Sequence, residues 1–572
     1  MIIHNNEIAQ KLDEMGDLLA IKGANKYRIR AYKNAARSIR SQGRRIDEMI
    51  DSGEDLTQLD SVGKDLASKI KEIVSTGELS DLKKLKNQLP STLLNLLDLE
   101  GLGPKRVKRL YDVLEIETQD DLKKAADNEK IREVKGFGKK TENNIREQLL
   151  DNNEKDRRFR IDKVEELIEP FRAYLQNIDT VSDLVIAGSY RRRKETVGDI
   201  DFLVIATDSK NMIEAFTKYE EVKKVISKGN TKSSVMLKTE LQVDLRVVEK
   251  RSKAPALLYF TGSKKHNIKL RKLGIDKGYK INEYGVFKDD KRIKCETEED
   301  IYKLLNLEYI EPELRENRGE IKAAKRNKLP DLIENKDIKG DLQMHTKHSD
   351  GSSSIKEMVE KAIEIGYEYI AITDHSSYIG VTNGLSDSEI PSYLDELKRV
   401  DEEYSEINVL SGIEVDVLED GKLDLTDESL KRMDVVIFSI HSHFNLEEKK
   451  QTDRILTAMD NKYVNIFAHP TGRMINKREG YKYDIEKVVQ HAASSNIIME
   501  INGSPSRLDL DDINSKMASD NHVSLVINTD AHSPKELSFM KYGISQARRG
   551  WVQADEVINT LNFTDVIKKF KR

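Results

Sequence analysis

The feature that most limits the fold of this chain is a regular alternation of short apolar runs and helical patterns across residues 337–572. The expected strands begin near residues 341, 369, 409, 435, 463, 497 and 524. Alternating strands and helices imply a parallel sheet, and seven such units suggest a barrel. In such barrels the chemistry lies at the C-terminal ends of the strands. We therefore expect a distorted (β/α)7 barrel with its functional side chains at one end.

Side chains that bind metal ions recur where these strands end. The segments AITDH, SGIEVD, FSIHSH, IFAHP and VINTDAH contain histidine, glutamate or aspartate at or near their ends. A single strand-end histidine is more often an ordinary core or surface group, but that interpretation does not explain five of seven strands. Mixed imidazole and carboxylate ligands suit Zn²⁺, Mn²⁺ or Fe²⁺ better than Ca²⁺. The candidate residues are His375, Glu414, His441, His469, Asp530 and His532.

The first expected strand also carries side chains that can bind a metal ion, but one of its polar positions is an amide. In DLQMHTKHSDG, residues 341–351, the period of a strand would turn Asp341, Gln343 and His345 to one face. His345 and Asp350 are good metal ligands, whereas the amide of Gln343 is a weak one. The stretch therefore predicts part of a metal site, with position 343 as its open question.

Charge divides the chain at about the same point. Residues 1–336 carry 68 Lys and Arg against 60 Asp and Glu, whereas residues 337–572 carry 28 against 41. Two histidines precede residue 337 and nine follow it. A basic half suits a polyanion, and an acidic, histidine-rich half suits divalent cations. Charge alone is equally consistent with solvent-exposed faces that merely differ in composition. The motifs have to distinguish the two interpretations.

Composition excludes several classes of protein. At 572 residues the chain should hold several domains, and 38% hydrophobic residues are enough for packed cores. No apolar run approaches the length of a membrane span, and MIIHNNEIAQKLDEM at the start lacks the basic and apolar regions of a signal peptide. Cys295 is the only cysteine, which excludes an internal disulfide. We therefore expect a cytoplasmic protein without a membrane partner.

Three segments of the basic half resemble one another: LDSVGKDLASKI (59–70), LEGLGPKRVKRL (99–110) and VKGFGKKTENNI (134–145). Glycine allows a tight turn before the next helix. The free N–H groups, the dipole and a lysine at the start of that helix form a binding site for a DNA phosphate. Such a site does not distinguish between bases. The segments resemble the helix-hairpin-helix motif of DNA-binding proteins, from which the first departs at Ser61. The candidate DNA contacts are Gly101, Gly103, Lys105, Gly136, Gly138 and Lys139.

A pattern of carboxylates follows in VIAGSYRRRKETVGDIDFLVI, residues 185–205. Asp199 and Asp201 lie two residues apart on an expected strand, so they share a face and repel each other unless a cation lies between them. A third acid, Asp244, lies in the alternating segment ELQVDLRVV. For the two aspartates alone, ordinary strands with acids facing water are the simpler interpretation. The preceding Gly-Ser turn and its arginines favour a divalent-ion site instead.

These residues resemble the catalytic segment of the family X DNA polymerases, and YFTGSKKHNIKLR (259–271) resembles their nucleotide-binding segment. The resemblance implies that Asp199, Asp201 and Asp244 hold two Mg²⁺ or Mn²⁺ ions for nucleotidyl transfer. Tyr259 and Phe260 have the alternative of being ordinary core residues of a helix. The implied nucleotide-binding residues are Gly188 in the turn, Ser189 and Arg192 for the triphosphate, Tyr259, Phe260 and Gly262 for the sugar, and Asn267 and Arg271 beside the nascent base pair.

The first eighty residues resemble the small N-terminal domain of that family, with YRIRAYKNAARSIR (27–40) as a basic helix for a 5′-phosphate. In some members this domain carries a lysine that forms a Schiff base with an abasic sugar, and Lys69 falls at the matching place. Such a lysine must lose its proton, which needs burial or nearby cations. Because the segment is rich in lysine, we expect a solvated Lys69 and do not predict lyase activity.

The acidic half resembles the PHP (polymerase and histidinol phosphatase) domain, a trinuclear metal phosphoesterase. The resemblance implies hydrolysis of a phosphodiester by metal-activated water, as a 3′→5′ exonuclease and in some cases at abasic sites. The family's first motif usually begins Asp-Leu-His-x-His, so Gln343 departs from it and predicts weakened hydrolysis. The implied ligands of up to three Mn²⁺ or Zn²⁺ ions are His345, Asp350, His375, Glu414, His441, His469, Asp530 and His532. His348 and His443 are spare neighbours, with His443 as the substitute for His441, and His491 and His522 are expected to be surface residues.

The two resemblances cover essentially the whole chain and match a known bacterial arrangement. We expect a monomeric DNA-directed DNA polymerase that fills short gaps in DNA repair, using gapped or primed DNA and deoxynucleoside triphosphates, with an appended 3′→5′ exonuclease. The alternatives are a repair nuclease, exonuclease or abasic-site endonuclease, whose polymerase half only binds DNA, and a non-catalytic DNA-binding scaffold. The expected domains are an N-terminal helical domain (1–82), a helix-hairpin-helix region (83–150), a nucleotidyltransferase palm (151–252), a nucleotide-selecting, thumb-like subdomain (253–315), a linker (316–336) and a PHP domain (337–572).

Overall fold

The computed structural model describes residues 5–40, 46–59, 61–97, 99, 102–150, 158–378, 380 and 382–571. It divides into two compact units, residues 1–157 and residues 158–572. The first unit is helical, and the described strands all lie in the second.

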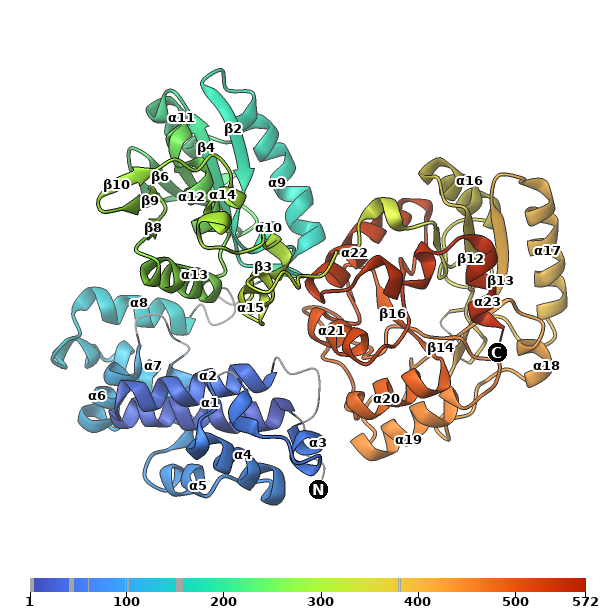
Figure 1. Ribbon diagram of the computed structural model, residues 1–572, viewed down its shortest axis with the longest axis horizontal. Helices are drawn as coiled ribbons and strands as arrows, with labels where there is room; N and C mark the ends of the chain where they lie inside the picture. The colour runs from blue at the N-terminus through green and yellow to red at the C-terminus, as the bar shows by residue number, and fades with distance from the viewer. Residues whose placement is uncertain are drawn as a thin grey trace. The chain divides into compact units, whose positions relative to one another are not determined.

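The first unit packs its helices around a single core. Apolar residues recur on one side of each helix, as in the buried Ile8 and Leu12 of α1 and the buried Val107 and Leu110 of α6. These side chains belong to the same cluster, so the N-terminal helices and the later hairpins share one core. The α-helices of this unit (Figure 1) are α1 (Asn5–Lys22), α2 (Lys26–Arg40), α3 (Ile46–Asp51), α4 (Lys64–Thr76), α5 (Ser80–Lys86), α6 (Pro104–Leu114), α7 (Gln119–Asp127) and α8 (Lys139–Leu150).

The three glycine segments each lead into a helix. Gly63 and Gly103 are the N-terminal caps of α4 and α6. The carbonyl of Gly138 accepts the amide of Glu142 in the first turn of α8 (3.0 Å). All three turns therefore present the free N–H groups of a helix start.

The left-handed residue of the hairpin turn is glycine in the third segment and serine in the first. Gly136 has φ +90°, and the guanidinium of Arg109 lies against it while donating to the carbonyl of Lys135 (2.6 Å). Ser61 takes the corresponding place with φ +64°. The first hairpin thus keeps the turn, at a backbone cost of about 1–2 kcal/mol for a residue with a Cβ.

The second unit begins with a five-stranded palm sheet of order β2-β4-β7-β6-β5, in which β4 and β7 are parallel and the other neighbours antiparallel. Along β4, Ile200 and Phe202 are fully buried and alternate with Asp199 and Asp201 on the opposite face. Phe171 on the covering helix α9 meets Phe202 edge-on, with 5.6 Å between ring centroids. The elements are β1 (Phe159–Arg160), α9 (Ile161–Gln176), β2 (Val181–Ile186), α10 (Gly188–Arg191), β3 (Thr196–Val197), β4 (Asp199–Ala206), α11 (Ser209–Thr217), β5 (Val222–Lys228), β6 (Lys232–Leu237), β7 (Gln242–Val247) and α12 (Lys253–Thr261).

The thumb-like part that follows is built around a buried ion network. Arg315 is fully buried and donates to Glu298 (2.6 Å) and to the carbonyl of Ile310 (2.9 Å). Arg191 of the palm donates to the same carboxylate (2.6 Å). Burial raises the pKa of Glu298, but the two arginines outweigh burial and lower it to about 2. The elements are α13 (Lys264–Asp276), β8 (Lys280–Asn282), β9 (Gly285–Lys288), β10 (Lys291–Ile293) and α14 (Glu298–Leu304).

The charged stretch 316–336, expected as a linker, is packed in place. It contains α15 (Glu320–Ala324), and the buried carboxylate of Glu320 lies 2.7 Å from the ring of His266 in the thumb. At its other end, Leu332 forms a β-bridge to Gln553 of the last domain. Its charges are therefore engaged in specific contacts as well as in solvation.

The last domain is a barrel of seven parallel strands in sequential order. A parallel bridge between Met344 and Ala531 joins its two edges, and the amide of His345 donates to the carbonyl of Ala531 (2.8 Å). The prediction of a distorted seven-stranded barrel is therefore confirmed. Its strands are β11 (Gly340–Asp341), β12 (Tyr369–Ile372), β13 (Asn408–Asp416), β14 (Val435–Ser439), β15 (Ile466–Phe467), β16 (Ile498–Asn502) and β17 (Leu525–Asn528). Its helices are α16 (Ile355–Ile365), α17 (Ile390–Glu403), α18 (Asp427–Leu430), α19 (Glu448–Met459), α20 (Ile485–Ser495), α21 (Asp512–Asp520), α22 (Met540–Arg549) and α23 (Phe563–Phe570).

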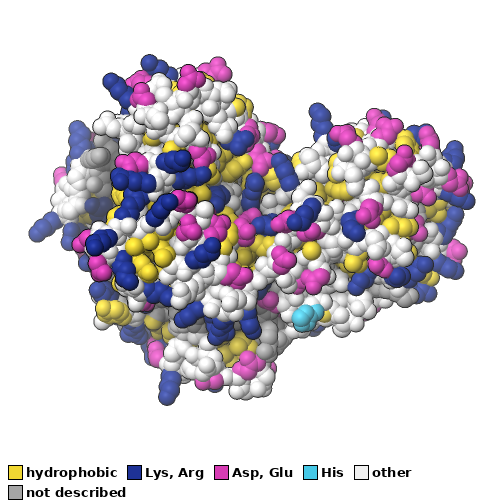
Figure 2. Space-filling view, turned by 45° about the horizontal axis from the view of Figure 1, so that its top comes forward, with side chains coloured by type: hydrophobic (Ala, Val, Ile, Leu, Met, Phe, Trp, Pro, Cys, Tyr) yellow, Lys and Arg dark blue, Asp and Glu magenta, His cyan; other side chains and the backbone are white. Residues whose placement is uncertain are grey.

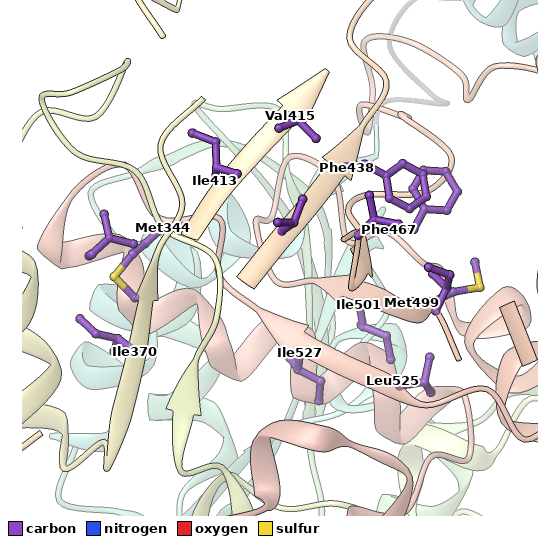
Figure 3. Close-up of a cluster of buried hydrophobic side chains, with 14 of the residues drawn as sticks. Met344, Ile370, Ile413, Val415, Phe438, Phe467, Met499, Ile501, Leu525 and Ile527 are labelled. Atoms are coloured by element: carbon purple, nitrogen blue, oxygen red, sulfur yellow. The ribbon is translucent and has the colours of Figure 1, made fainter. Parts of the chain in front are cut away.

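Alternation along the barrel strands separates apolar from polar side chains. Ile413 and Val415 on β13 belong to the large cluster between strands and helices (Figure 3), and Glu414 between them faces the opposite side. A second cluster joins Ala371 and Ile437 to Phe570 of α23. The expected metal-binding side chains thus face away from the apolar side chains that pack the strands against the helices.

The surface is strongly charged and shows little histidine. Figure 2 shows Lys and Arg side chains interleaved with Asp and Glu on the face that it presents. His345, His375 and His469 are buried, with exposed fractions of 0%, 6% and 1%. Among the described residues, the structure contains no helix long and apolar enough to cross a membrane.

Replacing Glu298 by Gln should destabilise the thumb, because it leaves Arg315 buried without a counterion. We expect the urea unfolding of the full chain, followed by circular dichroism, to show a loss of about 3–5 kcal/mol in the transition that includes this domain. Glu296→Gln is the matched control, since Glu296 is exposed and pairs with the exposed Lys294. Equal stability of the two variants would contradict the structural role of the network.

Candidate active sites

Three aspartates lie at one end of the palm sheet. Asp199 and Asp201 come from β4 and Asp244 from β7, and the parallel register places Asp201 beside Asp244. Burial, Asp199 and Asp244 together raise the pKa of Asp201 to about 7. Burial and Asp244 also raise the pKa of Asp199. A divalent cation relieves this repulsion, so the geometry fits a metal site.

The palm carboxylates are less closely gathered than those of the barrel. Gln242 Nε2 donates to Asp244 Oδ1 (3.2 Å) and holds that carboxylate beside its own strand. Within the described ranges, the groups of three or more ligand residues whose ligand atoms lie within 4.8 Å of one another belong to the barrel domain. The three aspartates therefore lie at one edge of the sheet, but their ligand atoms do not all lie within 4.8 Å of one another.

The turn before β4 approaches Asp201 closely. Gly188 has φ +66°, and a Cβ at this position would lie 2.6 Å from Asp201 Oδ2. The amide of Ala187 donates to the carbonyl of Asp201 (2.8 Å). The hydroxyl oxygen of Ser189 is buried and has no hydrogen-bond partner among the described residues. Only glycine fits the turn, and Ser189 keeps a free donor beside the aspartates.

A cavity of about 510 Å³ opens beside these aspartates. It is also lined by three cationic residues that sequence reasoning missed, Arg158, Lys194 and Lys264. Together with the predicted arginines they suit an anionic ligand such as a triphosphate. All eight residues expected to bind the nucleotide line the cavity: Gly188, Ser189, Arg192, Tyr259, Phe260, Gly262, Asn267 and Arg271.

Arg192 lines this cavity with its guanidinium already paired. Its Nε donates to Glu316 (3.0 Å) and its Nη1 to the carbonyl of Thr261 (2.6 Å). The side chain is 11% exposed. These two bonds use two of the five N–H groups of the guanidinium, so a triphosphate either takes the remaining ones or draws Arg192 away from Glu316.

Eight polar side chains converge at the C-terminal end of the barrel. Seven of them form three overlapping groups, in each of which one ligand atom of every residue lies within 4.8 Å of the others. The groups are His345, Asp350, His375 and His532; His375, Glu414 and His441; and His345, Glu414 and Asp530. His469 adds a contact of 3.1 Å from its Nε2 to Glu414 Oε1. Every ligand expected from the strand ends is therefore in this cluster.

Glu414 lies at the centre of the cluster and is fully buried. Its Oε2 lies 3.3 Å from His345 Nε2, and its Oε1 lies 3.5 Å from His441 Nε2. Burial opposes its ionisation, but His375 and hydrogen bonds with His345 and His469 hold the pKa of Glu414 well below its usual range. Burial lowers the pKa of His375 to about 4. An ionised carboxylate beside a neutral imidazole is the protonation state that binds metal ions.

Donor atoms are available to hold cations in this cluster. The Nδ1 atoms of His345, His375 and His469 are buried and, in the part of the chain that the structure describes, have no hydrogen-bond partner. Burial lowers the pKa of His345, but Asp530 and Glu414 outweigh burial and raise it well above the usual value. Positive charge is thus favoured between these two carboxylates. The residues present fit a cluster of divalent metal ions.

Gln343 faces the same cluster in a second role. It is fully buried, and its Nε2 donates to Glu414 Oε2 (3.0 Å). Its Oε1 has no partner among the described residues. The sequence presented Gln343 only as a weak ligand, whereas the fold makes it a group that orients Glu414.

Comparison with known proteins gives consecutive matches along the chain. The matching families are a helix-hairpin-helix domain (residues 3–79), a SAM-like helix-hairpin-helix tandem (93–151), the DNA polymerase beta palm (158–254), the DNA polymerase beta thumb (256–316) and the PHP domain (341–504). The DNA polymerase/3′-5′ exonuclease PolX of Bacillus subtilis strain 168 is 37% identical over 574 residues, covering 100% of both chains. The chain belongs to the family X DNA polymerases that carry a C-terminal PHP domain.

Membership of family X implies DNA and nucleotide binding and dependence on divalent metal ions. Shorter relatives are similar as well. A probable phosphatase of Thermoanaerobacter sp. strain X514 is 29% identical over 231 residues, which are 38% of this chain and 89% of that protein. A probable phosphatase of Caldanaerobacter subterraneus subsp. tengcongensis is 32% identical over 161 residues, 27% of this chain and 57% of that protein.

In this family X polymerase, Asp374 supports the first ligands of the barrel. It accepts hydrogen bonds from the amide and hydroxyl of Thr346 (both 2.7 Å) and from the hydroxyl of Ser349 (2.6 Å). These contacts fix the loop between His345 and Asp350. Asp374 directly precedes His375 in AITDH, so the motif contained it, but nothing in the sequence distinguished support from ligation.

Two further acidic residues contact expected metal ligands without belonging to the three ligand groups themselves. Asp416 Oδ1 lies 3.1 Å from His441 Nδ1. Glu500 accepts the amide of His469 (2.7 Å), and burial raises the pKa of Glu500 well above its usual value. Outer-sphere partners of this kind fix the orientation of metal ligands. Glu500 lies on β16, a strand for which the sequence predicted no site residue.

The remaining barrel histidines lie outside the three ligand groups. His443 lies 4.0 Å from Glu419, and His441 occupies the ligand group, so the substitute is not needed. His348 and His491 pair with Glu396 (3.2 Å) and Asp460 (2.9 Å).

The hairpin residues expected to contact DNA lie at the turns before α6 and α8. Gly103, Lys105, Gly136, Gly138 and Lys139 are all exposed, whereas Gly101 lies outside the described residues. Exposed glycines and lysines at a helix start are accessible to a phosphate group.

Lys69, predicted to be solvated, is half-buried and paired with carboxylates. Its side chain is 14% exposed, and its Nζ lies 2.6 Å from Asp65 and 3.8 Å from Asp81. Burial lowers the pKa of Lys69, but the hydrogen bond to Asp65 and the neighbouring Tyr32 outweigh burial and raise it. A lysine held in its charged form is a poor Schiff-base nucleophile.

Replacing Gly188 by Ala should lower nucleotide incorporation at least about tenfold, because the new Cβ displaces the Asp201 carboxylate. Gly198→Ala is the matched control, since a Cβ there meets only the flexible end of Arg158, at 3.3 Å. Primer-extension rates of both variants, with exonuclease rates as a check of folding, provide the measurement. A Gly188→Ala enzyme as active as the Gly198→Ala enzyme would show that the close approach is unimportant.

Proposed function

We propose that this protein is a DNA-directed DNA polymerase that fills short gaps during DNA repair, acting on gapped or primed DNA with deoxynucleoside triphosphates. The observation that supports this most is the pairing of Asp201 with Asp244 on parallel strands beside a basic cavity. We propose further that its PHP domain is a 3′→5′ exonuclease, an activity that the name of the Bacillus relative includes. The domain boundaries, the monomeric state and the cytoplasmic location stay predictions from the sequence.

In the polymerase reaction, Asp199, Asp201 and Asp244 would hold two divalent ions, Mg²⁺ or Mn²⁺. Such ions activate the primer 3′-hydroxyl and stabilise the charge of the leaving pyrophosphate. The free hydroxyl of Ser189 donates a hydrogen bond to the triphosphate, and Arg192 neutralises its charge. Catalysis then rests on positioning and on fixed charge around the transferred phosphoryl group.

The far side of the cavity selects the nucleotide. Tyr259 and Phe260 would face the sugar, and Arg246 stacks on Phe260 at 5.0 Å from the ring centroid. Asn267 and Arg271 lie on α13 and would meet the nascent base pair. Asn267 also donates to the carbonyl of Tyr259 (2.7 Å), which ties the sugar and base contacts together.

In the exonuclease reaction, the eight cluster residues would hold up to three ions, Mn²⁺ or Zn²⁺. Bound ions of this kind lower the pKa of a water molecule and polarise the phosphodiester. Glu414 belongs to two ligand groups, so it would help to hold more than one ion. Asp374, Asp416 and Glu500 orient the ligands, and burial keeps His375 neutral at physiological pH.

A repair nuclease, acting as an exonuclease or at abasic sites, is the second candidate, in which the polymerase half mainly binds DNA. It is favoured by one observation: ligand atoms of the barrel lie within 4.8 Å of one another, whereas the palm aspartates form no such group in the described residues. The free Ser189 donor and the basic cavity favour a working polymerase site instead.

Substitutions in the two sites should separate the two activities. Asp201→Asn should lower primer extension on a gapped duplex by at least about 100-fold, because it removes a charged metal ligand. It should leave exonuclease rates on single-stranded DNA unchanged, and Glu414→Gln should do the reverse. Equal extension by wild type and Asp201→Asn, or none by either, would contradict the polymerase assignment.

Gln343→His should raise Mn²⁺-dependent exonuclease activity several-fold, by roughly 3- to 10-fold, because imidazole binds these ions better than an amide. The bound metal, measured by elemental analysis before and after the change, should rise as well. No change in rate or metal content would contradict the idea that position 343 limits the nuclease. A fall in rate would indicate that the bond from Gln343 to Glu414 matters more than ligation.

A further inference from the structure

The loop that carries Ser189 and Arg192 is held by the barrel domain as well as by the palm. Glu195, at the end of this loop, accepts a hydrogen bond from Arg473 (2.6 Å). Arg193 pairs with Glu165 of α9 (3.3 Å), whose carboxylate also accepts Lys541 Nζ (2.6 Å) from α22. The PHP domain therefore contacts the basic loop directly at Glu195 and indirectly, through Glu165, at Arg193.

The contact nearest the nucleotide cavity comes from Arg549, the last residue of α22. Its Nη1 donates to the carbonyl of Arg192 (2.7 Å) and lies 3.2 Å from Glu316 Oε1. Its Nη2 donates to Asp512 of the barrel. The side chain is 2% exposed. A buried guanidinium with three acceptors has one fixed orientation, so Arg549 connects the barrel to the backbone of Arg192.

Glu316 is shared between two arginines. Its Oε1 accepts from Arg192 Nε (3.0 Å) and from Arg549. Burial raises the pKa of Glu316, but Arg549, Arg192 and Lys194 outweigh burial and lower it. The carboxylate is therefore ionised and competes with a triphosphate for Arg192. The more of its charge Arg549 balances, the less strongly Glu316 holds Arg192.

We infer that Arg549 of the PHP domain is a positioning residue for the polymerase reaction, which fixes the backbone of Arg192 and balances Glu316 so that Arg192 can transfer to the triphosphate. Arg549 does not line the nucleotide cavity, so it acts through Arg192. The PHP domain is then part of the nucleotide-binding apparatus in addition to carrying its own site. This inference rests on the proposed polymerase function.

The neighbouring residue provides a matched control. Arg548 also lies on α22, and it joins the barrel to the end of the thumb through Glu313 (2.8 Å) and to the stretch 316–336 through the carbonyl of Ile333 (3.1 Å). Its hydrogen bonds go to Glu313 and Ile333, and none goes to Arg192 or Glu316. Arg548→Gln therefore removes a comparable interdomain pair without touching the nucleotide loop.

The test is steady-state gap filling by the full-length variants with one deoxynucleoside triphosphate varied. We expect Arg549→Gln to raise the KM for the nucleotide about tenfold and to change kcat by less than about threefold, because a bond that positions a charged group is lost. Arg549→Lys should give an intermediate KM, and Arg548→Gln should stay within about twofold of wild type. Exonuclease rates on single-stranded DNA should be unchanged in all three.

A second substitution distinguishes positioning from simple loss of structure. Glu316→Gln removes the competitor, so the double variant Glu316→Gln/Arg549→Gln should recover a KM within about threefold of Glu316→Gln alone. If Arg549→Gln loses both activities, the KM values of Arg549→Lys and of the double variant test the inference instead.

An unchanged KM in Arg549→Gln, or an equal rise in Arg548→Gln, would overturn the inference while leaving the polymerase assignment intact. Failure of the wild-type enzyme to extend gapped DNA would instead refute the proposed function.

Discussion

A buried carboxylate among imidazoles is the interaction on which the barrel half depends. Glu414 is fully buried, and four histidines and one glutamine lie within 3.7 Å of its oxygens. Burying such a charge is costly unless opposite charge or hydrogen bonds compensate it. The cluster supplies that compensation, and its unpartnered nitrogen atoms are available to metal ions. The apolar faces of the strands hold this polar end in place, because each side chain between two ligands packs against the surrounding helices.

The palm also contains buried carboxylates, but they are less closely gathered than those of the barrel. Asp201 and Asp244 are neighbours on parallel strands, and burial with mutual repulsion raises the pKa of Asp201. Arg246 and Arg192 offset part of this rise. Arg192 belongs to a loop of arginines that are themselves engaged elsewhere: Arg191 with the thumb, Arg192 with Glu316 and Arg193 with α9. Because α22 of the barrel contacts this loop, the charge balance of the polymerase site extends into the neighbouring domain.

Much of the fold could be predicted, because its determinants are local. Short apolar runs with polar ends marked the barrel strands, and the eight ligands expected there meet in one cluster. The predictions were weaker where a residue's role depends on distant partners. Lys69, expected to be solvated in a lysine-rich segment, is half-buried, and Asp65 and Asp81 pair with it. The stretch 316–336, expected as a linker with helical character, contains α15, and the partners of its charges, such as His266, lie in other parts of the sequence.

The sequence by itself determined the residue types, their spacing and the faces of the strands on which they lie, and these suffice to indicate two metal sites. Only the tertiary structure decided which charges meet. It gave Gln343 a hydrogen bond to Glu414, made Glu500 the support of His469, and placed Arg549 against Arg192, 357 residues earlier in the chain. The physical reason is range: side-chain alternation acts between neighbouring residues, whereas electrostatic compensation acts between groups that only the folded chain brings within a few ångströms.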